Sequence, residues 1–183
     1  MSTVRLLVLG SCRRRGRAHG YAIHRELTDW RVETWTLVRP GSIYHALKQL
    51  AIEGHMRAVG EEPGVRGPGR TVYELTPGGE TEFLRLLEAA LSSFALDELS
   101  SGIAFMDALP RARAVELLHE QHRRATETRE GLEGLQGAYP DRVPAPHTRD
   151  LLELWSETLT TTAAWTLGLA ARLEAGEYLM ADD

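Results

Sequence analysis

The sequence predicts a mainly α-helical chain in which a winged helix-turn-helix, made of three helices and a β-hairpin, is followed by an all-helical region. Three observations lead to this prediction. Apolar residues recur at helical spacing along much of the chain, a segment rich in glycine and proline interrupts them at residues 63–69, and charge is divided unevenly along the 183 residues. We expect the first region to cover residues 1–95 and the second to cover residues 96–183.

The charge division separates a basic part of the chain from an acidic one. Residues 1–80 hold 12 Arg and Lys against 8 Asp and Glu, a balance of +4, and residues 81–183 hold 9 against 18, a balance of −9. This asymmetry suggests that the basic part faces nucleic acid. The longest charge-free stretch, 158–171, is too short and too polar to span a bilayer. The single cysteine, Cys12, fits a reducing compartment best, so we expect a cytoplasmic protein without a membrane segment.

Local signals place the elements of the first region. The apolar run Val4–Leu9 and a later pattern from Ala22 to Trp30 predict two short helices separated by a basic loop. A third helix of about three turns is expected at residues 41–54. Its start can be capped by Ser42 or Gly41, and its end by Gly54 in the left-handed conformation.

A hairpin and a further helix follow the third helix. Residues 56–62 and 70–75 have strand-like composition, and the glycines and prolines of residues 63–69 predict the loop that joins them. Thr76 and Pro77 suit the start of a helix. In the second region, helices are predicted from Pro110 to about Gln136 and from about Thr148 to Ala175. His122 and Arg129 interrupt the heptad of the first, which weakens an autonomous coiled coil without excluding a paired helix.

The third helix carries the first candidate binding residues. Its apolar residues Ile43, Leu47 and Leu50 are expected to point inward, which leaves a polar outer face suited to phosphates and base edges: Ser42, Tyr44, His45, Lys48 and Gln49. Gln49 is the only Asn or Gln among the first 80 residues. If a side-chain amide in this region hydrogen-bonds an adenine, that amide must belong to Gln49. The alternative is an ordinary surface helix, since any such helix exposes polar residues.

Arginines flank this helix on both sides in the sequence. Arg66 and Arg70 surround Gly67 in the hairpin loop, where backbone amides can approach phosphate and guanidiniums can follow a groove. Arg15 and Arg17, in a run that begins at Arg13, precede the second helix, whose N-terminal amides favour a phosphate. The alternative for both segments is a solvated loop.

The order of these motifs resembles the PadR family of transcriptional regulators. The resemblance rests on His19-Gly20-Tyr21 at the second helix, on Pro40 to Tyr44 with Ala46, Leu47, Leu50, Glu53 and Gly54 in the third, and on Gly67 to Arg70 followed by Tyr73 to Thr76 and Gly78 in the hairpin. It covers residues 4 to about 90, and the two-helix remainder is similar to the C-terminal dimerisation domain of the larger subfamily.

The resemblance implies a homodimer that binds double-stranded operator DNA, expected to be an inverted repeat, and represses transcription. It implies release of the DNA when a small, commonly aromatic molecule binds. The residues that would then face DNA are Ser42, Tyr44 and Lys48. The hairpin arginines would contact the DNA backbone or the minor groove. His19 and Tyr21 are also counted among the expected DNA-binding residues. Two departures are the arginine-rich run from Arg13 to Arg17 and His55, where an apolar residue is common.

Other functions have weaker support in the sequence. Phe94, Phe105, Trp155 and Trp165, with Tyr139, could line an effector pocket, or they could be core and dimer-interface aromatics. His119, Glu120 and His122 could hold a metal, but their spacing is not that of a zinc protease and no cysteine pair joins them. No nucleophile with a base and no phosphate-binding loop stands out, so we expect neither an enzyme nor a cofactor. A helical dimer that binds proteins through its acidic half and has lost DNA binding is the competing hypothesis.

Overall fold

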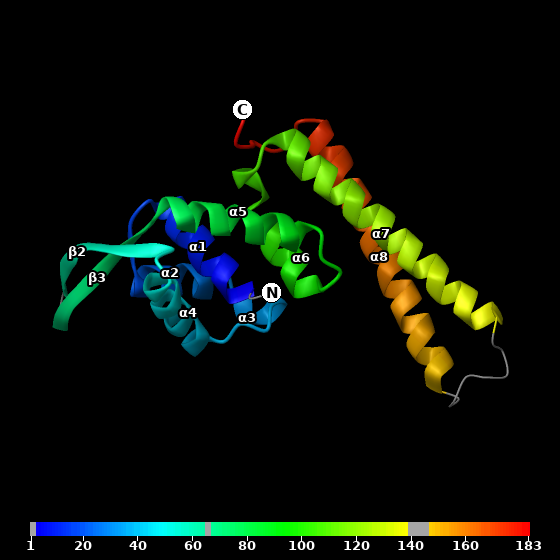
Figure 1. Ribbon diagram of the computed structural model, residues 1–183, viewed down its shortest axis with the longest axis horizontal. Helices are drawn as coiled ribbons and strands as arrows, with labels where there is room; N and C mark the ends of the chain where they lie inside the picture. Colours follow the sequence, from blue (N-terminus) through cyan, green and yellow to red (C-terminus); the bar gives the residue numbers. More distant parts are fainter. Residues whose placement is uncertain (1–2, 65–66, 139–146) are drawn as a thin grey trace. The chain divides into compact units, whose positions relative to one another are not determined.

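The computed structural model describes residues 3–64, 67–138 and 147–183, which form two compact units (Figure 1). Unit 1 comprises residues 1–90 and 95–106, and unit 2 comprises residues 91–94 and 107–183. The fold is mainly helical with one small antiparallel sheet, as the sequence predicts. No helix among the described residues is both long and apolar enough to cross a membrane.

Helix α1 (Thr3–Arg15) is the centre of unit 1. Its residues from Leu6 to Cys12 are all buried, although a helix with one covered face would expose some of them. Helices α2, α4 and α6 and strand β3 all pack against α1, which explains burial on every side. The expected basic loop after Leu9 was wrong, because Arg13, Arg14 and Arg15 form the last turn of this helix.

Helices α2 (Gly20–Asp29) and α4 (Pro40–Ile52) form the helix-turn-helix. His19 is the N-cap of α2, and its Nδ1 accepts a hydrogen bond of 3.0 Å from the amide of Ala22. A one-turn helix between them, α3 (Val32–Trp35), was not predicted from the sequence. It follows Arg31, whose φ of 53° is in the left-handed region.

The caps of α4 differ in part from the expectation. Neither Ser42 nor Gly41 caps the helix, which begins at Pro40, and the Ser42 hydroxyl instead donates 2.6 Å to the carbonyl oxygen of Arg39. Proline suits the first helical position because it has no N–H to leave unbonded. Gly54 adopts the expected left-handed conformation, with φ of 79°, and the next amide bonds back to the Leu50 carbonyl.

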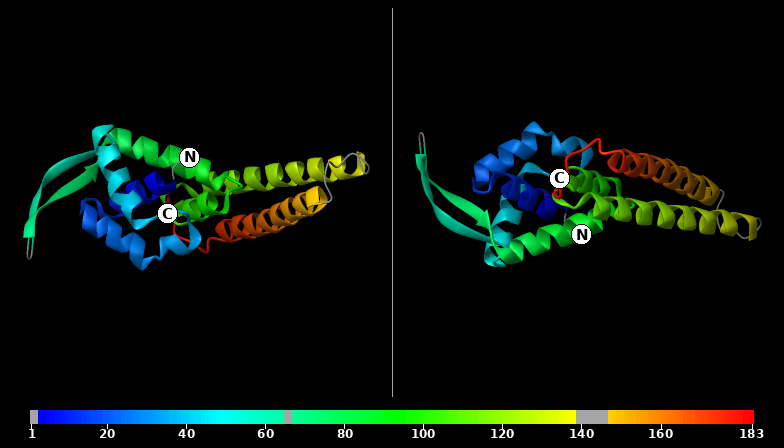
Figure 2. Two further views of the ribbon diagram at one scale, coloured as in Figure 1. Left: turned by 90° about the horizontal axis from the view of Figure 1, so that it is seen from below. Right: turned by 90° about the horizontal axis from the view of Figure 1, so that it is seen from above.

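Strands β2 (Met56–Gly64) and β3 (Gly67–Leu75) form an antiparallel hairpin that extends away from the helices of unit 1 (Figure 2). Both strands run further into the glycine- and proline-rich segment than the sequence predicted, and register shifts occur between Ala58 and Gly60 and between Glu62 and Gly64. A two-residue strand, β1 (Ala18–His19), pairs with β3 and gives the order β1-β3-β2. Strand β1 was not predicted from the sequence.

Helix α5 (Pro77–Leu91) begins as predicted, with the Thr76 hydroxyl accepting a 3.0 Å hydrogen bond from the amide of Gly79. After it come α6 (Leu96–Ile103) and a short 3-10 helix, η1 (Met106–Ala108), which were not predicted. The Phe105 ring, 2% exposed, lies against α1, where a Cβ on Gly10 would be 2.5 Å from it. Only glycine at position 10 lets this ring pack so closely.

Unit 2 is built on the long helices α7 (Arg111–Ala138) and α8 (His147–Glu174), which pack side by side along their length. Both match the predicted helices. Their apolar core contains Ala125, Leu159 and Ala163, with Phe94 and Leu132 packed against it. One buried contact is polar, because the Thr166 hydroxyl lies 2.9 Å from Oε1 of Gln121 and both residues are fully buried. Arg111 ties the C-terminus to this unit through the Leu173 and Tyr178 carbonyls and Asp183.

Candidate nucleic-acid interface

Helix α4 presents the outer face that the sequence predicted. Ile43, Leu47 and Leu50 are at most 5% exposed and point into the core of unit 1. Tyr44, His45 and Lys48 are exposed, and Ser42 and Gln49 are half-buried. The predicted polar side chains therefore share one side of a helix whose opposite side is anchored by apolar packing.

The Tyr44 ring is held in place by a contact that the sequence did not reveal. It stacks on His24 of α2, with ring centroids 5.3 Å apart and an angle of 21° between planes, while 47% of the residue stays exposed. Gly20 lies beside the same ring, and a Cβ there would be 3.4 Å from it, an ordinary van der Waals distance. Stacking fixes the ring before any ligand arrives, which reduces the entropy lost when the hydroxyl engages a partner.

A polar hollow lies between α2, the residues just before it and strand β3 of the hairpin. It encloses about 470 Å³ and brings together four of the predicted residues, together with Arg25 and Asp29: Arg15, His19, Tyr21 and Arg70. The guanidinium of Arg70 sits 5.0 Å from the centre of the Tyr21 ring, a cation–π distance. Sequence spacing alone could not have paired them, since β3 and α2 meet only in the folded chain. Arg66 lies outside the described residues, and Gly67 is the first residue of β3.

Arg17 has an acidic partner within the unit. Its Nε lies 3.0 Å from Glu74, which also accepts hydrogen bonds from Arg57 on the neighbouring strand. The hydrogen bonds from Arg57 and then Arg17 lower the pKa of the Glu74 carboxyl, so it stays ionised at neutral pH. This triad joins β2, β3 and the start of β1, and it offsets part of the positive charge of Arg17.

The arginine run at the end of α1 likewise binds groups inside unit 1. Arg15 pairs with Glu26, a buried carboxylate that also accepts a 2.9 Å hydrogen bond from Ser11. Arg13 pairs with Glu80 at 2.7 Å. Arg14 lies over the rings of Trp30 and Phe105 and donates to the Ala104 carbonyl. The run therefore holds α1 to its neighbours, a role that its charge alone did not indicate.

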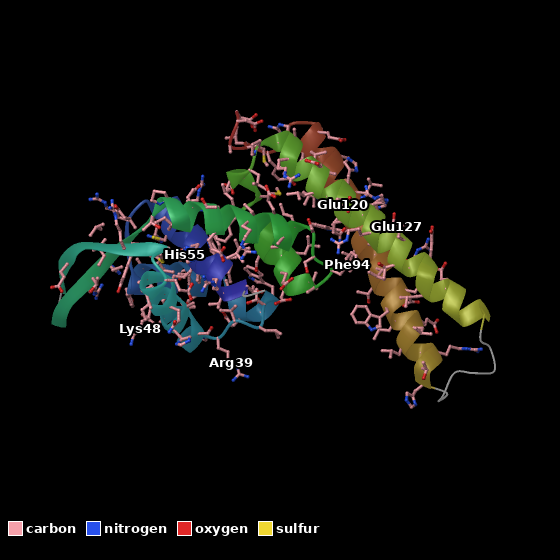
Figure 3. All side chains as sticks on the ribbon, viewed as in Figure 1. Arg39, Lys48, His55, Phe94, Glu120 and Glu127 are labelled. Carbon is pink, nitrogen blue, oxygen red and sulfur yellow. The ribbon has the colours of Figure 1, made fainter. Side chains whose placement is uncertain are left out.

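Two cations near α4 have no carboxylate partner among the residues that the structure describes. Lys48 lies on α4 and Arg39 immediately precedes it, and both side chains extend outward from the same side of unit 1 (Figure 3). Arg39 was missed by the sequence analysis because a single arginine before a helix carries no distinctive signal. Unpaired, exposed cations of this kind are the groups that can engage an external anion.

The four candidate effector residues divide between the two units. Phe105 belongs to unit 1 and fills space against Gly10, with its ring edge-on to Phe83. Phe94 belongs to unit 2, where the guanidinium of Arg124 covers its ring at 5.2 Å. Trp155 and Trp165 lie on α8, with 52% and 47% of each residue exposed, and Tyr139 lies outside the described residues.

The residues considered for metal binding and catalysis have other partners. His119 lies 3.2 Å from Glu174, whereas Nδ1 of His122 is 2.9 Å from the Ala163 carbonyl oxygen, so the two imidazoles are engaged at different points on α8. Cys12 is fully buried, and burial, aided by the charge of Glu74, raises the pKa of its thiol to about 12. A thiol of this kind is almost wholly protonated at neutral pH and is a poor nucleophile.

Together, an anchored helix with a polar outer face and a hairpin extended by a third strand define a winged helix-turn-helix protein. Residues 8–85 match the family described as "Transcriptional regulator PadR-like family". Over these residues the winged helix unit of this chain is similar to the PadR-like family of transcriptional regulators.

The chain is also similar to solved structures. Bacillus subtilis PadR in complex with operator DNA is 21% identical, covers 94% of this chain and 99% of its own, and has a TM-score of 0.42. The PadR-like transcriptional regulator BC1756 from Bacillus cereus is 17% identical with the same coverage and a TM-score of 0.40. Bacillus subtilis PadR in complex with p-coumaric acid is 20% identical with a TM-score of 0.37. No curated protein sequence matches the chain.

The ion pair between Arg15 and Glu26 yields a first prediction. Removing one member of a buried pair costs about 3–5 kcal/mol, but the Arg15 side chain is 42% exposed and solvent screens it, so we expect Arg15→Ala to lower the free energy of unfolding by about 1–2 kcal/mol. Urea denaturation followed by circular dichroism measures the change. Lys48→Ala, which removes an unpaired surface cation, serves as control and leaves stability unchanged. If Arg15→Ala has the same free energy of unfolding as the wild-type protein, the ion pair does not hold α1 to α2.

Proposed function

We propose that the protein is a homodimeric transcriptional repressor that binds operator DNA through unit 1 and releases it when a small aromatic molecule binds. The observation that carries the proposal is the outer face of α4, where Tyr44, His45 and Lys48 are exposed. Beside them lies Arg39, which is exposed and has no carboxylate partner among the described residues. An α-helix with donors on one side fits the major groove of B-DNA, and its apolar side fixes the register of those donors.

In this arrangement the residues of unit 1 divide into two roles. Tyr44, Lys48 and Gln49 on α4 would meet base edges, whereas Arg70, Tyr21 and His19 around the polar hollow would meet phosphates. The hairpin extends beyond the helices, which suits contact with the backbone or the adjacent minor groove. The acidic partners of Arg15 and Arg17 suggest that these two arginines support the fold more than they bind DNA.

Dimerisation is supported by an apolar stripe on α8. Leu151, Leu154, Trp155 and Trp165 are between 47% and 61% exposed, and their spacing places them along one side of the helix, with threonines 158 and 162 between them. Exposed apolar surface of this extent on a helix is unfavourable in water unless it is covered. A second copy of the same stripe would cover it with two-fold symmetry and would place two DNA-binding units on one inverted repeat.

An effector is proposed from the aromatic side chains of unit 2. Phe94, Trp155 and Trp165 offer flat surfaces on which an aromatic ring can stack. Because Trp155 and Trp165 belong to the apolar stripe, an effector stacked on them would lie within the dimer interface. Phe105 is less suited to direct contact because it is buried within unit 1. These stacking surfaces favour flat aromatic ligands as a class.

DNA binding gives the second prediction. Arg70→Ala should weaken binding to specific and random duplexes alike and reduce the slope of log K against log salt by about 1, because a phosphate contact is lost. Gln49→Ala should instead relax preference at one base position by about 1–3 kcal/mol. Fluorescence anisotropy at several salt concentrations measures both effects, with Arg85→Ala on α5 as a control. If the wild-type protein binds specific and random duplexes equally well, the proposal is wrong and a protein-binding dimer is favoured.

The third prediction concerns assembly. Replacing Leu151 and Leu154 together by glutamate places two charges in the apolar stripe and should convert a dimer into a monomer, since unpaired charges are costly to bury. Thr160→Glu, on a different side of α8 and equally open to solvent, is the matched control and should stay dimeric. Sedimentation equilibrium gives the mass. A double variant that remains dimeric would place the interface elsewhere.

The fourth prediction concerns the effector. A ligand specific to the folded state raises the melting temperature, and the rise continues as the ligand concentration increases above its Kd. Thermal-shift screening of phenolic acids, antibiotics and cationic dyes should therefore reveal a class that stabilises the protein. The same compounds should release bound duplex in an anisotropy competition. Trp155→Ala and Trp165→Ala should lose the stabilisation, whereas Thr160→Ala should keep it. Compounds that bind without releasing DNA would contradict the proposed regulation.

A further inference from the structure

The centre of the outer face of α4 includes an apolar residue that the proposed function does not use. Ile43, Ala46, Leu47 and Leu50 are the buried residues of this helix and define its inner side. At 3.6 residues per turn, the opposite line passes through four residues spread over about three turns: Gly41, His45, Lys48 and Ile52. Ile52, an aliphatic residue, thus lies on the same line as the lysine.

Ile52 is among the most exposed apolar residues of unit 1. It is 68% exposed, and it lines a hollow of about 510 Å³ at the junction of α4 with the hairpin, together with Lys48, Met56 and Arg57. An isolated exposed aliphatic side chain is common on protein surfaces. Ile52 differs in its position: it lies one helical turn after Lys48, on the face of α4 that points away from the core.

The surroundings of Ile52 allow close approach by a large ligand. A Cβ on Gly41, at the other end of the same line, would have no neighbour within 4 Å, so the start of the helix is also unobstructed. Lys48 and Arg39 have no carboxylate partner among the described residues, and Figure 3 shows both side chains directed outward. This positive charge favours a polyanion over an apolar peptide as the occupant of the face.

We propose that Ile52 is a specificity-determining residue that contacts the C5-methyl group of a thymine in the major groove, within about two base pairs of a guanine bound by Lys48. Lysine donates to O6 and N7 of guanine, and aliphatic groups contact the thymine methyl. Residues 48 and 52 are separated by about 6 Å along the helix, close to two base-pair steps. The inference rests on the proposed DNA binding and adds the base that the exposed isoleucine selects.

The test removes single methyl groups from DNA. Wild-type protein first selects its preferred site from a randomised duplex library, and each thymine of that site is then replaced in turn by deoxyuridine, which lacks only the C5-methyl. We expect at least one replacement per half-site to weaken binding about fourfold, the effect of exposing one buried methyl group. In Ile52→Ala the same replacement should have no effect, whereas Ile52→Val should keep part of it.

Controls separate this inference from the proposed function. Leu96→Ala on α6 removes a side chain of similar exposure, 72%, and should show the wild-type deoxyuridine profile. Selection that enriches no sequence would overturn the proposed function and the inference with it. An enriched site without thymine, or a deoxyuridine effect that persists in Ile52→Ala, would overturn the inference alone. Ile52→Ala that weakens every duplex equally would assign Ile52 to the DNA backbone and would also overturn it.

Discussion

The burial of α1 is the constraint on which the rest of unit 1 depends. Seven consecutive residues of this helix, Leu6 to Cys12, are inaccessible, which is possible only if elements cover every side. Helices α2 and α4 lie against it directly, so the two halves of the helix-turn-helix are positioned by a common support. Gly10 extends this support to the segment after α6 by admitting the Phe105 ring. A displacement of α1 would therefore move the candidate DNA-binding helix and its neighbours together.

Charge in unit 1 is divided between internal and external roles. Arg13, Arg15 and Arg17 each have a carboxylate partner within the unit, and Arg14 lies on aromatic rings. Such pairs contribute to folding and reduce the charge available to an external anion. The cations that remain near α4 are few and lie on one side. A protein with a net charge of −5 can thus still present a positive surface where the proposed DNA contact falls.

Unit 2 shows a related separation between covered and uncovered surface. Its core is small, with alanines at Ala125 and Ala163 that allow α7 and α8 to approach closely. The buried pair of Gln121 and Thr166 adds a polar contact that is satisfied at only one relative position of the two helices. The apolar stripe of α8 is left outside this core, so the unit is complete as a helical pair but still has a surface suited to a second copy.

The sequence by itself determined the elements whose signals are local. Helical spacing located α4, α7 and α8, and Gly54 and Thr76 gave the boundaries on either side of the hairpin, because caps and turns depend on a few neighbouring residues. The inward position of Ile43, Leu47 and Leu50 followed from the same periodicity. The family resemblance over the first 90 residues agrees with the match at residues 8–85.

Tertiary structure decided the features that depend on residues distant in the chain. Strand β1 exists only because β3 pairs with it, and α6 is too short for a clear periodic signal. The arginine run reads as a basic loop in the sequence, but Glu26 and Glu80 become its partners only after folding. For the same reason the sequence could not show that His24 stacks on Tyr44 or that Ile52 lines a hollow with Met56 and Arg57 of the hairpin. Local propensity sets which segments are helical, whereas packing sets which charges remain free to bind.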